Sequence, residues 1–90
     1  MLYLVYFGLT LPKSFYRDLY QKLPYLGPKE RIYENCYLLA SQMSVTALRR
    51  TLYRYLATSD MLVVCTMAPG QCAGKLPPYL KRFVEQHIQA

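Results

Sequence analysis

The chain has 90 residues, of which 53% are hydrophobic and 14% aromatic, and its formal net charge is +6. This length allows one domain, residues 1–90, near the lower limit for a chain that buries an adequate core unaided. So apolar a chain is not disordered, and its positive charge favours nucleic acid, an anionic membrane or an acidic protein as partner. Small size with many aromatic residues suggests that a partner covers some apolar surface, so we expect a homodimer.

The apolar runs are too short to span a membrane. The longest, residues 1–7 and 61–65, fall well short of the roughly 20 residues that a spanning helix needs. No Lys or Arg precedes the first run and no small-residue cleavage site follows it, so we expect no signal peptide. Three cysteines without CxxC spacing argue against a disulfide framework or a zinc site. We expect a cytoplasmic protein without membrane contact, in which Cys36 and Cys65 are buried.

The first half of the chain predicts a strand, a helix and a second sheet segment. Residues 2–9 have the composition and length of a buried strand. The turn TLPKS follows, with Ser14 as the expected N-cap of a helix that Pro24 ends. The apolar stripe of this helix repeats every fourth residue, at Phe15, Leu19 and Leu23. Next comes RIYENCYLLA, residues 31–40, whose polar centre Glu34-Asn35 allows either one bent strand or two short strands sharing a bulge.

The second half predicts a helix, a strand and a last helix. Ser44 is the expected N-cap of the first of these, and its buried stripe contains Val45, Leu48 and Leu52. Residues 61–67, MLVVCTM, have the composition of a central strand. The loop APGQCAG leads to two prolines that precede the last helix, where proline is tolerated in the first turn. The apolar positions of this helix are Leu80, Phe83, Val84, His87 and Ile88.

The order β-α-β(β)-α-β-α predicts an α+β fold with helices on one face of a small sheet. Two right-handed β-α-β crossovers place the first strand and residues 61–67 side by side at its centre. This is the ferredoxin-like β-α-β(β)-α-β arrangement with an additional C-terminal helix. Residues 1–67 form its core, and residues 68–90 form the loop and the helix. The second face of the sheet is expected to be free for a ligand or a second subunit.

The acidic residues and the histidine form no recognisable catalytic or metal-binding pattern. Asp18 complements a helix dipole, Asp60 reads as a turn residue, and Glu34 is expected at a sheet edge or paired with Arg31. The single His87 has no nearby cysteine or carboxylate partner in the sequence. The GxSxG motif and the spacing of a phosphate-binding loop are both absent. We therefore expect no catalytic residues, no metal and no cofactor.

The basic residues are better organised than the acids. They fall into three groups along the predicted helices: Lys13 with Arg17; Arg49, Arg50 and Arg54; Lys75, Lys81 and Arg82. Each group is either a solvated surface that keeps the protein soluble or a set of contacts to nucleic-acid phosphates. Like charges at helical spacing repel one another slightly, and an anionic partner offsets that cost.

The ten tyrosines suggest a second mode of nucleic-acid binding. Tyr3 and Phe7 share one face of the first strand and Tyr6 lies on the other, while Tyr33 and Tyr37 can share a face of the next segment. Aromatic side chains on an open sheet face stack on unpaired bases in RNA-recognition modules. The RNP1 pattern of those modules is absent, and packing in a core or a dimer is the competing interpretation.

The segments MLYLVYFGLT, RIYENCYLLAS and TSDMLVVCTM, with the basic first helix between the first two, resemble the CRISPR-associated protein 2 family over residues 1–67. The resemblance implies a small ferredoxin-like homodimer that bridges CRISPR integrase subunits and supports double-stranded DNA during spacer acquisition in antiviral defence. Nuclease members close the first strand with a metal-binding aspartate, and the matching position here is Gly8. In members without that aspartate, the basic start of the first helix touches DNA, at positions that correspond to Lys13 and Arg17.

The tail departs from the family, whose members often end in a strand that joins the partner's sheet, whereas YLKRFVEQHI is predicted to be helical. We expect a non-catalytic, dimeric scaffold that binds double-stranded DNA or RNA. The alternatives are a metal-dependent endoribonuclease or toxin-type nuclease that uses Glu34 or Asp60, and a protein-interaction module with incidental positive charge.

Overall fold

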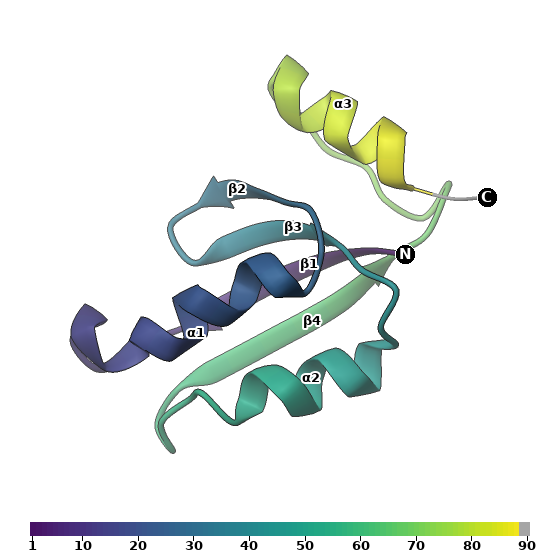
Figure 1. The fold of residues 1–90 in the computed structure, drawn as a ribbon. Coiled ribbons are helices and arrows are strands. Elements are labelled where there is room, and N and C mark those ends of the chain that lie inside the picture. Colours follow the sequence, from purple (N-terminus) through teal and green to yellow (C-terminus); the bar gives the residue numbers. More distant parts are fainter. Residues whose placement is uncertain (89–90) are drawn as a thin grey trace.

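The computed structural model describes residues 1–88, which form a four-stranded antiparallel sheet and three α-helices (Figure 1). None of the helices in this range has the length and apolarity needed to cross a membrane. The elements follow one another as β1 (Leu2–Gly8), η1 (Lys13–Tyr16), α1 (Arg17–Lys22), η2 (Leu23–Tyr25), β2 (Lys29–Tyr33), β3 (Cys36–Ala40), α2 (Val45–Tyr53), β4 (Met61–Met67) and α3 (Pro78–His87), where η marks a short 3-10 helix.

The strand order across the sheet is β2-β3-β1-β4, and each neighbouring pair is antiparallel. Tyr6 of β1 lies opposite Cys36 of β3 on one side and Val63 of β4 on the other. The predicted adjacency of β1 and β4 is confirmed. The prediction that residues 61–67 form a central strand is wrong, because β3 occupies the second side of β1 and leaves β4 at the edge of the sheet.

The segment of residues 31–40 forms two short strands rather than one bent strand. Glu34 and Asn35 lie in the turn between β2 and β3, and Asn35 has a φ of 59°. Asparagine adopts this left-handed conformation more readily than most residues, so the polar pair is suited to the turn. The pairing of the two strands shifts register between Arg31 and Tyr33.

The first face of the sheet packs against α1 and α2. Alternate residues of β1, namely Tyr3, Val5 and Phe7, are almost fully buried on this face. The predicted helix stripes supply Leu19 and Leu23 from the first helical region and Leu48 and Leu52 from α2. The prediction is confirmed for these four leucines. It is wrong for Val45, which is 39% exposed because it is the first residue of α2 and lies at the end of the packed face.

The start of the first helical region differs from the prediction. It begins as the 3-10 helix η1, and Tyr16 is the residue before α1, so Ser14 does not cap an α-helix. Because a 3-10 turn has about three residues instead of 3.6, it changes which side chains point inward. Tyr16 is 1% exposed, whereas Phe15, which the stripe placed inside, is 55% exposed.

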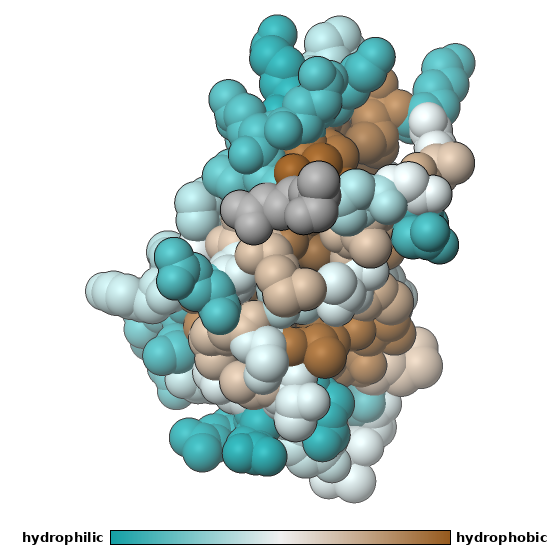
Figure 2. All heavy atoms as spheres, turned by 90° about the vertical axis from the view of Figure 1, so that its right-hand side faces the viewer, coloured by the Kyte–Doolittle hydropathy of each residue, from teal (hydrophilic) through white to brown (hydrophobic). Residues whose placement is uncertain are grey.

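The second face of the sheet is covered over one half by α3. Pro77 and Pro78 begin this helix as predicted, and its Leu80 and Phe83 pack with Leu2, Leu38 and Ala40 of the sheet. Figure 2 shows hydrophobic side chains gathered beneath α3, whose outer surface is hydrophilic. The expectation that this face is wholly free is therefore wrong, because the C-terminal helix folds back onto it.

The other half of the second face is open. We call it the open patch, and it consists of Tyr6, Gly8, Met61, Val63 and Cys65. Tyr6 is 40% exposed, Met61 61% and Val63 46%. Cys65 was expected to be buried but is exposed here, because β4 has no layer over this half. Cys36 is half-buried.

Candidate nucleic-acid interface

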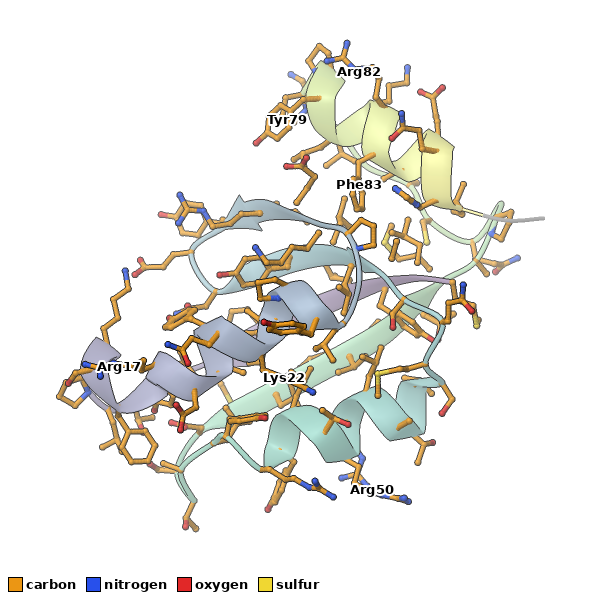
Figure 3. All side chains as sticks on the ribbon, viewed as in Figure 1. Arg17, Lys22, Arg50, Tyr79, Arg82 and Phe83 are labelled. Atoms are coloured by element: carbon orange, nitrogen blue, oxygen red, sulfur yellow. The ribbon has the colours of Figure 1, made fainter. Side chains whose placement is uncertain are left out.

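The eight basic residues predicted to contact nucleic acid are all exposed, but they do not form one patch. Figure 3 shows Arg17, Arg50 and Arg82 on three separate helices, well apart from one another and at the surface of the molecule. Lys75 lies on the connector before α3. Of the side-chain hydrogen bonds within residues 1–88, none has a lysine or arginine as donor. Their hydrogen-bonding capacity is therefore available to an external anion.

One predicted basic residue has a defined environment. Lys13 lies in η1, and its Nζ is 5.9 Å from the centroid of the Tyr20 ring. Arg17, which the sequence analysis grouped with Lys13, is the first residue of α1 and does not share the environment of Lys13. Lys13 is thus grouped with residues of the β2–β3 hairpin that are distant in sequence.

The groove is formed where η1 and α1 meet the β2–β3 hairpin, and it has a volume of about 630 Å³. Pockets of roughly 300–1,000 Å³ are typical of small-ligand sites. We call it the tyrosine groove, and it is lined by three tyrosines, two cations, one carboxylate and one amide: Tyr20, Tyr33, Tyr37, Lys13, Arg31, Glu34 and Asn35.

The three rings of the tyrosine groove differ in how firmly they are held. Tyr37 is 9% exposed, and its ring packs edge-on against Phe7 with centroids 6.3 Å apart. Tyr20 donates a hydrogen bond of 3.0 Å from its hydroxyl to Oδ1 of Asn35. Tyr33 is 77% exposed, at the end of β2. The groove therefore combines two anchored rings with one ring that is open to solvent.

Cations flank two of these rings. The Nζ of Lys29 lies 5.6 Å from the centroid of Tyr37, and that of Lys13 lies within 6 Å of Tyr20. Both distances fall within the range in which an ammonium group is attracted to an aromatic face. The first helical region and β2 thus each place one cation beside one of these two rings.

Both anchored phenols stay neutral near pH 7. Burial raises the pKa of Tyr20, and the neighbouring Tyr37 and Glu34 raise it further. Burial also raises the pKa of Tyr37, against a smaller lowering effect of Arg31. Because the ordinary tyrosine pKa is already near 10, both hydroxyls keep their protons, and Tyr20 uses its proton in the hydrogen bond to Asn35.

Sequence reasoning found only part of this groove. Tyr33 and Tyr37 were considered for base stacking, but Tyr20 and Arg31 were not identified as site residues. Tyr3 and Phe7, which were also considered, are 0% and 1% exposed, so they belong to the core. The usable sequence signal was the turn at Glu34-Asn35, since a hairpin there brings Tyr33 and Tyr37 to one end of the sheet.

Asp60 is held by the fold. Its Oδ1 accepts hydrogen bonds from the backbone N–H and the hydroxyl of Thr10, each at 2.8 Å, and its Oδ2 accepts one from the Ala57 N–H at 2.7 Å. The Tyr16 hydroxyl lies 2.8 and 2.7 Å from the two carboxylate oxygens. Partial burial, the largest single influence, raises the pKa of Asp60, but these hydrogen bonds together outweigh it and lower the pKa from 3.8 to about 2. Asp60 therefore acts as a structural acceptor.

The other residues considered for chemistry lie apart from one another. Gly8 pairs with Met61 across the sheet, and a Cβ added at Gly8 would lie 2.9 Å from Cε and 3.1 Å from Cβ of Met61. His87 packs its ring against Phe83 with centroids 4.5 Å apart. Within residues 1–88, no group of three or more His, Cys, Asp or Glu is placed to hold a metal ion.

These observations define a small α+β protein with a four-stranded antiparallel sheet, a cation-flanked tyrosine groove and an open apolar patch. No protein-family model, curated protein or solved structure matches the chain.

Proposed function

We propose that this chain is a non-catalytic, dimeric nucleic-acid-binding scaffold of the kind found in the CRISPR-associated protein 2 family, and that it bridges an integrase and double-stranded DNA. The observation that carries the proposal is the set of exposed lysines and arginines that donate no side-chain hydrogen bond within residues 1–88, on a chain of net charge +6. Such side chains bind phosphates and set the position of a protein on nucleic acid without reading its sequence.

The topology supports the same proposal. The element order β1-α1-β2-β3-α2-β4 with the strand order β2-β3-β1-β4 is compatible with a ferredoxin-like fold, to which α3 is added. We propose this fold for residues 1–67.

The open patch supports a homodimer. It contains no charged residue, and Tyr6, Met61 and Val63 expose a large share of their apolar surface. In a small domain, such a surface is stabilised when a second copy covers it. A dimer formed through this patch leaves α1 and α2, on the opposite face of the sheet, free for DNA.

The proposal is tested by titrating the protein with labelled duplex DNA over a range of salt concentrations. Several phosphate contacts predict a steep fall of affinity with salt, with a slope of about −0.9 per contact on a double-logarithmic plot. The double substitution Lys13→Gln/Arg17→Gln should weaken binding to all sequences alike and reduce this slope by about 2.

A control removes one charge from the same helical region outside the predicted basic groups, by Lys22→Gln, and is expected to change the slope less than Arg17→Gln alone. Duplex binding that is absent or independent of salt would overturn the proposal.

The nuclease alternative is tested by incubation with RNA and magnesium or manganese. If the unmodified protein cleaves the RNA and Asp60→Asn or Glu34→Gln abolishes the cleavage, the protein is a nuclease and the scaffold proposal is wrong.

A further inference from the structure

We infer that the tyrosine groove binds an unpaired nucleotide of single-stranded nucleic acid. This inference rests on the proposed function, which supplies the nucleic acid. It adds a second binding site on the protein, whose ligand is an unpaired end or loop of that nucleic acid. The groove has the volume of a small-ligand site, about 630 Å³, and three of its seven lining side chains are aromatic.

The rings provide the surface on which a base stacks. Tyr33 is 77% exposed at the rim, so its ring can meet a base without any change in the core. Tyr20 is fixed by its 3.0 Å hydrogen bond to Asn35, so it loses little freedom when a ligand binds. Base–aromatic stacking tolerates any sequence, because every base has a π-face.

The charges at the groove match a nucleotide phosphate. Lys13 and Arg31 line the groove, Lys29 lies beside Tyr37, and Glu34 is the single carboxylate among the lining residues. The excess of positive charge next to the rings suits a ligand that carries one phosphate for each base. Duplex DNA offers the phosphates but keeps its base faces stacked inside the helix, so it does not use the tyrosines.

The remaining two lining residues favour a base over an acidic peptide. Oδ1 of Asn35 accepts from Tyr20, which leaves the two N–H donors of its amide for the edge of a base. The Glu34 carboxylate accepts hydrogen bonds from the amino groups that cytosine, adenine and guanine carry. An acidic peptide offers carboxylates to the cations, but it has no base face to stack on the tyrosines.

The experiment compares three tyrosine variants of the full chain by fluorescence anisotropy with a short labelled single strand of mixed sequence. Tyr33→Ala should weaken single-strand binding by about tenfold, because it removes the exposed stacking ring. Tyr33→Phe keeps that ring and should stay within about twofold of the unmodified protein. Tyr25→Ala is the matched control, since Tyr25 is 84% exposed but lies outside the groove.

Two further probes separate stacking from charge. A strand with the same phosphates but with abasic sites should bind Tyr33→Ala and the unmodified protein equally well. A duplex of the same sequence should also be insensitive to Tyr33→Ala. Circular dichroism spectra of all three variants should match that of the unmodified protein, because Tyr33 and Tyr25 lie at the surface.

The inference is overturned if the protein does not bind the single strand, if Tyr33→Ala binds it as tightly as Tyr25→Ala does, or if polyglutamate displaces the single strand more effectively than an unlabelled oligonucleotide. Its failure is distinct from that of the proposed function. Salt-dependent duplex binding with no effect of Tyr33→Ala removes only this inference, whereas Tyr33-dependent single-strand binding without duplex binding removes only the duplex scaffold.

Discussion

The Asp60 carboxylate connects the loop after β1 to the turn before β4 through hydrogen bonds. It accepts hydrogen bonds from Thr10, Tyr16 and Ala57, so one side chain joins the loop after the first strand, the first helical region and the turn before the last strand. These bonds favour the ionised carboxylate, which is why the pKa falls to about 2 although partial burial opposes the change.

This lowered pKa gives a pH dependence of stability with a defined sign. The pKa of Asp60 is lower in the folded chain than its ordinary value of 3.8, so its contribution is complete above about pH 4 and is lost as the pH falls toward 2. Asp60→Asn should lower the melting temperature near pH 7, and the difference from the unmodified protein should shrink between pH 4 and 2. Thermal unfolding followed by circular dichroism measures this difference in melting temperature. A difference that stays constant between pH 7 and 2 would contradict the prediction.

At the scale of single elements, Ser44 and Ser14 were both predicted to cap a helix, but only Ser44 does so in the structure. The Ser44 hydroxyl accepts a 3.1 Å hydrogen bond from the Ala47 N–H at the start of α2, as the sequence predicted. Ser44→Ala should lower the free energy of unfolding by about 1 kcal/mol. Ser14 lies within η1 instead of at a helix start, so Ser14→Ala should change the free energy of unfolding by less than about 0.5 kcal/mol. Equal effects in urea denaturation would show that the two sites do not differ.

The C-terminal helix is held by few residues. Leu80 and Phe83 are its buried side chains, and Figure 3 shows Phe83 pointing from α3 toward the sheet. Phe83→Ala should destabilise the protein by about 3 kcal/mol and increase the binding of an apolar dye, because it uncovers Leu2 and Leu38. Tyr79→Ala is the control on the same helix, since Tyr79 is 48% exposed. A Phe83→Ala variant as stable as Tyr79→Ala would mean that α3 is not packed on the sheet.

At the scale of the whole molecule, the open patch predicts the oligomeric state. Light scattering during size-exclusion chromatography should give the mass of a dimer. Val63→Lys places a charge in the open patch and should give a monomer of similar helix and strand content. Val45→Lys makes the same change at a valine on α2, outside the patch, and should remain dimeric. A monomeric unmodified protein, or a dimer that tolerates Val63→Lys, would remove the proposed interface.

The sequence alone predicted the α+β class, the order of the elements and most of the core. Buried positions such as Leu48 and Leu52 repeat with the helical period, and the cap of α2 is encoded by a serine three residues before the N–H that it accepts from. These features depend on neighbours within one or two turns, which is why a single sequence is enough to find them.

The tertiary structure decided which elements meet. That β4 lies at an edge, that α3 covers half of the second face, and that Lys13 and Tyr20 join Arg31 and Tyr33 in one groove all depend on segments far apart in the chain. Local periodicity does not encode these contacts, because many packings of the same amphipathic elements bury the same stripes. The packing that was adopted set the positions of the tyrosines and the cations, and with them the candidate site.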